Sequence, residues 1–183
     1  MYKVAVILAE GFEEVEAIAP VDLLRRAKIE CVTVSLAREK LVPSSRNIPV
    51  MADRSWEEVD FDEFDGVVLP GGLAGTERLL ADVRVEALLK QFAQAGKLTA
   101  AICAAPTVLA KAGILEGRRA ICYPGLEEKL TGALVSCEEV VRDGTVITSR
   151  GMGTSVPFGL ALAGYFLGNE AAEALAAKIV YRR

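Results

Sequence analysis

Short apolar runs alternate with helix-like runs along most of the chain, and this alternation limits the possible folds more than any other feature. Runs typical of buried strands cover residues 2–9, 30–36, 66–69 and 98–102, and helical patterns cover residues 13–27 and 76–95. Parallel strands need crossover connections of this length, and the crossover helices then cover both faces of the sheet. The sequence therefore predicts an α/β fold with a mostly parallel open sheet.

The rest of the chain continues this pattern. Residues 38–53 are rich in turn formers and suggest a hairpin, residues 119–122 suggest a strand, and Asp143-Gly144 predicts a tight turn between strands at 139–142 and 145–149. Two further helices are expected from about Thr154 and Asn169, and Gly96 is expected to end the helix over 76–95. No G-x-G-x-x-G follows the first strand, so the fold is expected to be flavodoxin-like rather than dinucleotide-binding. Without linkers or repeats, residues 1–183 are expected to form a single domain.

Composition and charge exclude several classes of function. The net charge is −4 and the Lys and Arg residues are scattered, which argues against a nucleic-acid partner. The apolar start of the chain is short and leads directly into acidic residues, unlike a signal peptide. The longest apolar stretch, residues 156–167, is broken by glycine and is too short to cross a bilayer. A soluble, cytoplasmic protein with no membrane partner is expected.

The chain contains no histidine. This excludes Cys-His and Ser-His-Asp mechanisms and removes the commonest zinc ligand. The four cysteines form no C-x-x-C pair, so neither a disulfide framework nor a metal site is expected, and no cofactor is implied.

The strand at residues 98–102 ends on Cys103, and a helix-forming run follows it. The small residues Ala101 and Ala105 flank this cysteine, as expected for a nucleophile elbow, where bulk at these positions would clash. A cysteine above a helix N-terminus is favoured as the thiolate. The alternative interpretation is that Cys103 is a small buried hydrophobic residue.

Three strand exits should meet at one edge of the sheet, where open parallel sheets bind ligands. Gly71 and Gly72 follow one strand, and their N–H groups, with that of Ala104 beside Cys103, can form an oxyanion hole. Glu16 follows another strand on an apolar stripe, where burial would raise its pKa and let it share a proton with a thiolate. The alternative is that the two glycines merely form a turn.

Several longer runs match a known family at its own spacing. They are Val6-Ile-Leu-Ala-Glu-Gly-Phe-Glu-Glu-Val-Glu16, Pro20-Val-Asp-Leu-Leu-Arg-Arg-Ala, Val67-Val-Leu-Pro-Gly-Gly72, Ala100-Ala-Ile-Cys-Ala-Ala-Pro-Thr107 and Asp143-Gly-Thr-Val-Ile-Thr-Ser-Arg-Gly-Met-Gly-Thr-Ser155. Over nearly its whole length the chain resembles the ThiJ/PfpI superfamily, in the branch of the Parkinsonism-associated protein deglycase.

The resemblance implies roles for individual residues. Cys103 matches the family's reactive, easily oxidised cysteine, and Glu16 matches the protonated glutamate that hydrogen-bonds it. Gly72 and Ala104 match the backbone donors around the sulfur. Arg46 matches an arginine that lines the pocket from the neighbouring subunit, so a homodimer is expected.

The chain also departs from the family pattern. Tyr123 stands where the family has a histidine, Leu73 replaces a polar residue and Met152 replaces a proline. Tyrosine can donate a hydrogen bond, but its ordinary pKa of about 10 makes it a poor base at neutral pH. A peptidase mechanism of the Cys-His kind is excluded.

We therefore expect a glyoxalase/deglycase-type enzyme that acts on methylglyoxal, a small 2-oxoaldehyde, or on early glycation adducts. The Cys103 thiolate would attack the aldehyde and Glu16 would act as acid and base. A second hypothesis is a non-catalytic oxidative-stress sensor or chaperone in which Cys103 is oxidised to a sulfinate. A third, purely structural interpretation leaves Cys103 unreactive.

Overall fold

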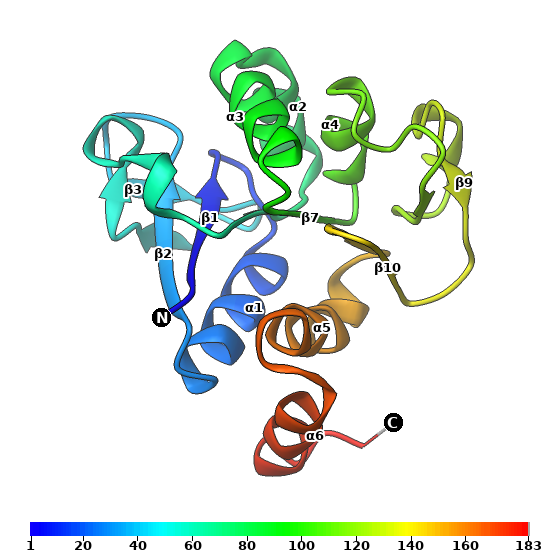
Figure 1. Cartoon of the computed structure of the whole chain (residues 1–183). Helices are drawn as coiled ribbons and strands as arrows, with labels where there is room; N and C mark the ends of the chain where they lie inside the picture. Colours follow the sequence, from blue (N-terminus) through cyan, green and yellow to red (C-terminus); the bar gives the residue numbers. More distant parts are fainter. Residues whose placement is uncertain (183) are drawn as a thin grey trace.

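The computed structural model describes residues 1–182 and contains a central seven-stranded sheet (Figure 1). The strands lie in the order β10-β11-β7-β6-β1-β2-β5. Their bounds are Lys3–Leu8 for β1, Glu30–Ser35 for β2, Arg54–Ser55 for β5, Gly66–Leu69 for β6, Leu98–Ile102 for β7, Val140–Asp143 for β10 and Val146–Ser149 for β11. Every neighbouring pair is parallel except the hairpin of β10 and β11. The predicted mostly parallel sheet is confirmed.

Helices cover both faces of this sheet, as Figure 1 shows. The helices are α1 (Glu14–Arg26), α2 (Leu73–Ala81), α3 (Val83–Gln94), α4 (Pro106–Lys111), α5 (Ser155–Leu167) and α6 (Asn169–Lys178). Alternate strand residues divide between two cores: Ala5 and Ile7 of β1 pack with α2, α3 and α4, whereas Val4 and Val6 pack with α1 and α5. Because both faces of the central strands are buried, these strands are mostly apolar, with Lys3 of β1 and Thr99 of β7 as exceptions.

Two smaller sheets lie outside the central one. Strands β3 (Leu41–Pro43) and β4 (Pro49–Met51) form the hairpin expected within residues 38–53. The strand expected at residues 119–122 is shorter, since β8 covers only Arg119–Ala120. It pairs with β9 (Leu134–Val135) rather than with the central sheet. Ala120 of β8 is nevertheless buried in the core that β1 shares with α2, α3 and α4.

The single helix expected over residues 76–95 is wrong, because two helices occupy this region and the first begins earlier. Asp82 separates α2 from α3 with an extended backbone (φ −92°, ψ 112°), and its side chain accepts a hydrogen bond from the Arg84 N–H at 2.9 Å. This N-cap satisfies a donor that would otherwise be unpaired at the start of α3. The expected end of the second helix is confirmed, since Gly96 follows it with φ +66°.

The strand order reverses direction next to β1. From β1 the chain proceeds to β2 on one side and, later, to β6 and β7 on the other. The parallel register pairs Val6 with Val68 and Leu69 with Ala101, so the carboxyl ends of β1, β6 and β7 lie at one edge. Such a reversal leaves a crevice beyond the strand ends.

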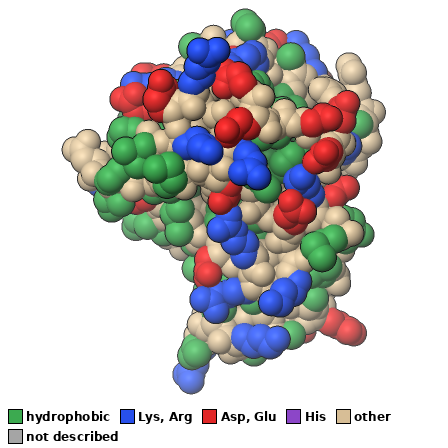
Figure 2. All heavy atoms as spheres, turned by 90° about the vertical axis from the view of Figure 1, so that its left-hand side faces the viewer, with side chains coloured by type: hydrophobic (Ala, Val, Ile, Leu, Met, Phe, Trp, Pro, Cys, Tyr) green, Lys and Arg blue, Asp and Glu red, His purple; other side chains and the backbone are tan. Residues whose placement is uncertain are grey.

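Charged side chains of both signs are intermixed on the face drawn in Figure 2, and hydrophobic side chains gather at one side of it. Within residues 1–182, no helix is both long and apolar enough to span a membrane.

Candidate active site

Cys103 lies on a sharp turn between β7 and α4. Its φ of +66° is uncommon for a residue with a side chain and marks local backbone strain. Two hydrogen bonds hold the turn: the Cys103 N–H donates to the Ser149 carbonyl at 3.0 Å, and the Tyr123 N–H donates to the Cys103 carbonyl at 2.8 Å. The backbone therefore has the strand-to-helix geometry expected of a nucleophile elbow.

Glu16 lies in the first turn of α1 with only 1% of its surface exposed. Glu13 positions this turn, because its carboxylate accepts a hydrogen bond from the Glu16 N–H at 2.8 Å. Glu16 Oε2 in turn accepts a hydrogen bond from the Gly71 N–H at 3.0 Å. The buried carboxyl is thus held by the loop that follows β6.

Burial is the main cause that raises the pKa of Glu16 to about 7. The nearby charge of Glu13 raises it further, whereas hydrogen bonds with Cys103 and with the Gly71 N–H oppose the shift. Glu16 therefore exchanges a proton near neutral pH, as a general acid or base must.

The Cys103 thiol and the Glu16 carboxyl are hydrogen-bonded to each other, and each shifts the pKa of the other. Burial and the charge of ionised Glu16 raise the pKa of the Cys103 thiol to about 12, and the N–H groups of Gly72 and Ala104 lower it. When Glu16 holds the proton its charge disappears, and these two N–H groups then favour the thiolate. Above about pH 7 the pair carries one negative charge, which lies on the carboxylate because the pKa of Glu16 is lower than that of Cys103.

Gly71 lets the thiol and the carboxyl approach each other. A Cβ at this position would lie 2.5 Å from Glu16 Oε2 and 2.6 Å from the Cys103 Cβ. Any larger residue would push one of these groups away. Gly72 has φ +87°, a left-handed conformation that favours glycine, and this conformation places its N–H near the sulfur.

A pocket of about 630 Å³ opens above these groups. Its lining includes every residue expected at the site except Gly71, which lies beneath it; the expected residues in the lining are Cys103, Glu16, Gly72, Ala104, Tyr123 and Arg46. Arg46 reaches the pocket from the loop between β3 and β4 of the same chain. This loop is tied to the segment between β1 and α1, since the Ser45 N–H donates to the Phe12 carbonyl at 2.7 Å.

Comparison with known proteins assigns the family. Residues 2–164 match the model of the DJ-1/PfpI family. The chain belongs to the DJ-1/PfpI family. It is 42% identical to the protein dj-1beta of Drosophila melanogaster, over 93% of this chain and 92% of that protein. It is 38% identical to a protein of Pyrococcus abyssi named as a deglycase, over 81% of this chain and 89% of that protein.

A solved structure of the same family agrees closely with this fold. The cysteine-to-alanine mutant of a DJ-1 superfamily protein from Salmonella typhimurium superposes with a TM-score of 0.95. It is 38% identical, and the match covers 100% of both chains. The resemblance found in the sequence is therefore confirmed, as is the flavodoxin-like fold of the DJ-1/PfpI family.

The structure refines the sequence expectations for this DJ-1/PfpI site. The Gly71 N–H was expected to help form the oxyanion hole, but it donates a hydrogen bond to the Glu16 carboxylate. Glu13, to which the sequence analysis gives no role, caps α1 by accepting a hydrogen bond from the Glu16 N–H. Ser149, which fixes the Cys103 backbone, was not singled out, although it lies in a run that matches the family.

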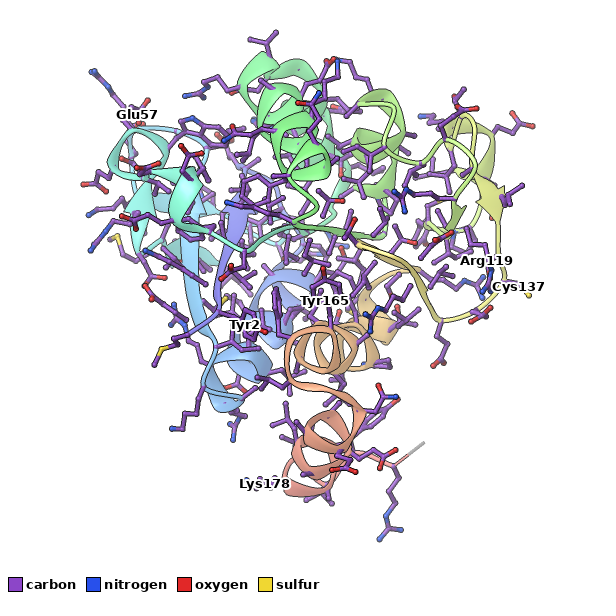
Figure 3. The ribbon with its side chains drawn as sticks, viewed as in Figure 1. Tyr2, Glu57, Arg119, Cys137, Tyr165 and Lys178 are labelled. Atoms are coloured by element: carbon purple, nitrogen blue, oxygen red, sulfur yellow. The ribbon has the colours of Figure 1, made fainter. Side chains whose placement is uncertain are left out.

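The other three cysteines lie in different surroundings. Cys31 and Cys122 are buried, and burial raises the pKa of each thiol, to about 12 and about 11 respectively. Cys137 is exposed and lies beside Arg119 at the edge of the molecule (Figure 3). Among the four, Cys103 is the one placed at a pocket together with a buried carboxyl.

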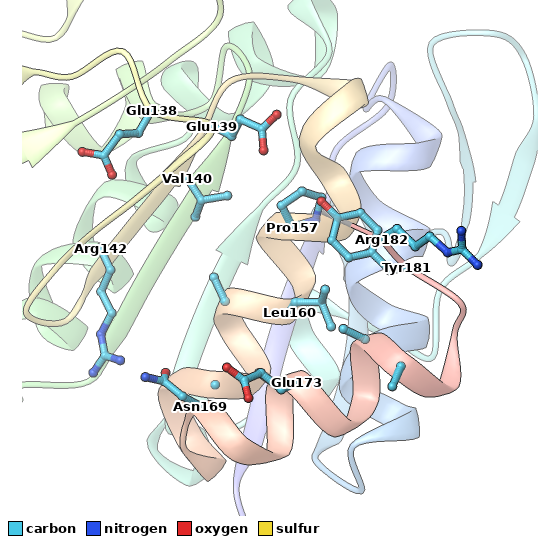
Figure 4. A pocket seen from close by; sticks show the side chains of 15 residues that line it. Glu138, Glu139, Val140, Arg142, Pro157, Leu160, Asn169, Glu173, Tyr181 and Arg182 are labelled. Carbon is cyan, nitrogen blue, oxygen red and sulfur yellow. The ribbon is translucent and has the colours of Figure 1, made fainter.

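A larger pocket of about 1070 Å³ lies between β10, α5 and α6 (Figure 4). Its polar side chains include Glu139, Arg142 and Glu173. None of the lining residues described is a cysteine or a buried carboxylate, so this pocket lacks the groups found around Cys103. Residues 1–182 also contain no group of three or more Cys, Asp or Glu side chains arranged to hold a metal ion.

Proposed function

We propose that this DJ-1/PfpI protein is a glyoxalase/deglycase-type enzyme acting on methylglyoxal or on early glycation adducts. The observation that carries the proposal is the contact of the Cys103 thiol with a buried Glu16 carboxyl whose pKa is about 7. The Pyrococcus abyssi relative named as a deglycase supports the same class of activity. The enzyme is proposed to work as one domain, without metal or cofactor.

The first step forms a carbon–sulfur bond. The Cys103 thiol passes its proton to Glu16, and the resulting thiolate attacks the aldehyde carbon of the substrate. The carbonyl π electrons move to the oxygen, which takes the proton from Glu16 to give a hemithioacetal. The N–H groups of Gly72 and Ala104, which already favour negative charge at this place, stabilise the oxyanion as it develops.

The second step moves a hydrogen between two carbons. Ionised Glu16 removes the proton from the former aldehyde carbon and delivers it to the ketone oxygen, which gives an enediol. It then removes the proton from the hydroxyl on the sulfur-bearing carbon and delivers it to the neighbouring carbon, so that a carbonyl forms beside the sulfur. The product is a lactoyl thioester on Cys103. Water then cleaves the thioester, releasing lactate and restoring the thiol, so the net reaction is addition of water to methylglyoxal with no external oxidant or reductant.

Tyr123 is proposed to act as a hydrogen-bonding wall of the pocket and not as a base. Its ring lies against Gly151, since a Cβ there would be 3.3 Å from the tyrosine ring. Glu16 is therefore proposed to perform each proton transfer in turn.

A homodimer is proposed as the working form. Apolar side chains stay exposed on one turn of α1, at Val15 and Ile18, and on the β3–β4 hairpin, at Ile48 and Met51. Burying such side chains against a second copy would remove apolar area from water. Arg46 lies in the same hairpin, so it is placed to act near this interface.

Four free cysteines suit a reducing compartment such as the cytoplasm.

A redox sensor or chaperone is the second candidate function, and two observations favour it. The chain has no histidine that could supply a second base. The same groups that would hold an oxyanion, the N–H groups of Gly72 and Ala104 and protonated Glu16, can also hold a sulfinate on Cys103.

Lactate release from methylglyoxal tests the enzyme proposal. The assay contains no added thiol or metal and compares the wild type with Cys103→Ser and with Cys137→Ser, which removes an exposed thiol away from the pocket. The proposal expects activity in the wild type and in Cys137→Ser, and loss in Cys103→Ser. A wild type without turnover, or an active Cys103→Ser variant, would contradict it.

A further inference from the structure

Three large apolar side chains lie exposed at the mouth of the Cys103 pocket. Leu73, Tyr123 and Met152 all line it, with exposed fractions of 70%, 52% and 56%. Most large apolar side chains of the central sheet and its helices are buried. Three exposed apolar side chains around one pocket therefore indicate a surface that binds an apolar group. Each comes from a different segment of the chain: the start of α2, the loop after β8, and the turn before α5.

The backbone places each of the three next to the site of Cys103 and Glu16. Leu73 follows Gly72, whose N–H lies near the sulfur, and the Tyr123 N–H donates to the Cys103 carbonyl. Met152 follows Gly151, where a Cβ would lie 3.9 Å from Glu16 Oε1. Because the backbone fixes these positions, the three side chains form an apolar rim around the place where a substrate carbonyl must sit.

Charged residues also line the pocket, among them Glu13, Glu16 and Arg78, which lies in α2 with Leu73. Glu10 and Arg78 form an ion pair at 3.1 Å, and Arg46 extends from the β3–β4 loop. The pocket volume of about 630 Å³ is much larger than a three-carbon aldehyde needs. The methyl group of bound methylglyoxal would leave most of the apolar rim in contact with water, whereas a larger apolar substituent on the substrate would cover the rim.

We propose that the apolar rim of Leu73, Tyr123 and Met152 selects 2-oxoaldehydes that carry a bulky apolar substituent, such as an aryl group, over methylglyoxal. This inference rests on the proposed function and names its preferred substrate class. The chemistry is unchanged: Cys103 adds to the aldehyde, Glu16 moves the proton to the neighbouring carbon, and water releases a 2-hydroxy acid. Phenylglyoxal would yield mandelate with no further reactant. Burial of apolar surface by the aryl group supplies the selectivity.

The first test compares kcat/KM for phenylglyoxal and for methylglyoxal. The wild type is expected to favour phenylglyoxal, and the double variant Leu73→Ser with Met152→Ser is expected to lower that preference about tenfold, chiefly through KM for phenylglyoxal. Leu134→Ser, which removes another exposed leucine, in β9 and outside the pocket lining, serves as the control and should keep the wild-type preference. An unchanged preference in the double variant would overturn the proposal.

A second readout needs no turnover. Alkylation of Cys103 by N-phenylmaleimide and by N-ethylmaleimide is followed by mass spectrometry, with each rate divided by the rate for free N-acetylcysteine. The wild type should favour the aryl reagent, and the double variant should lose this preference. If the wild type turns over neither aldehyde but still reacts faster with the aryl maleimide, the proposed function is wrong, while the selection of aryl groups by the apolar rim is supported. Equal normalised alkylation rates in the wild type would contradict that selection.

Discussion

The backbone N–H of Gly71 donates a hydrogen bond to Glu16 Oε2 at 3.0 Å, although 55 residues separate the two. This contact joins α1 to the loop after β6 and fixes the carboxyl beside the Cys103 thiol. It is possible because position 71 has no side chain, since a Cβ would lie within 2.6 Å of both Glu16 and Cys103 atoms. The relative position of acid and nucleophile therefore depends on one glycine.

Replacing Gly71 by alanine should disturb both the fold and the activity. The added Cβ must displace Glu16 Oε2 or the Cys103 Cβ, and overpacking of this kind costs about 1–3 kcal/mol of unfolding free energy. Lactate release should fall by more than about tenfold, since misplacing a catalytic group by an ångström is costly. Urea unfolding and the lactate assay measure the two effects. Gly153→Ala, where a Cβ meets nothing within 4 Å, should change neither.

The pH dependence of stability should reveal the raised pKa of Glu16. The folded protein keeps the Glu16 proton up to about pH 7, whereas the unfolded chain loses it near pH 4.5. The contribution of Glu16 to the free energy of unfolding is therefore largest below about pH 4.5, and it is lost as the pH rises towards 7. Relative to Glu16→Gln, the wild type should lose about 3 kcal/mol of unfolding free energy across this window.

Glu14 provides the control for this titration. Burial opposes ionisation of Glu14, but hydrogen bonds from its own N–H and from Ser45 outweigh it and lower its pKa. The stability difference between the wild type and Glu14→Gln should therefore change with pH in the opposite direction and at lower pH. If the Glu16→Gln difference stays flat between pH 4.5 and 7, the carboxyl is ionised in the folded protein and its raised pKa is refuted.

The sequence identified the catalytic candidates because their signals are local. Cys103 follows an apolar strand and Glu16 sits on an apolar helical stripe, and both patterns can be found without knowing the fold. The direction of the Gly71 N–H was not predictable, because it depends on how the β6 exit meets α1 in space. The break at Asp82 was missed for a different reason. The apolar periodicity of residues 76–95 continues across Asp82. Only the N-cap that Asp82 provides shows that two helices meet there.

Replacing Asp82 by alanine should destabilise the protein without affecting the chemistry. The variant loses the N-cap of α3, the hydrogen bond from the Arg84 N–H, which typically costs about 1 kcal/mol. It also loses the ion pair with the Arg84 side chain, a contact at 2.6 Å. Asp22→Ala, which removes an exposed ion pair within α1, should cost less than about 0.5 kcal/mol. Urea unfolding compares the two, and equal losses would argue against the cap.

Mild peroxide treatment separates site chemistry from simple exposure. Exposure alone favours oxidation of Cys137, because Cys103 is only partly exposed. The arrangement of Gly72, Ala104 and Glu16 around the sulfur predicts instead that Cys103 forms the first stable sulfinate. Peptide mass spectrometry over time measures the order. Oxidation spread evenly over the four cysteines would remove the support for the sensor function.

The most direct test of the account is lactate release from methylglyoxal by Glu16→Gln, with Glu14→Gln as the matched control on the same helical turn. Glu16→Gln keeps the thiol but cannot accept or return a proton, so kcat should fall by about 10²-fold or more. Glu14→Gln removes one carboxylate outside the pocket lining and should stay near the wild-type rate. Full turnover in Glu16→Gln would contradict the proposed mechanism.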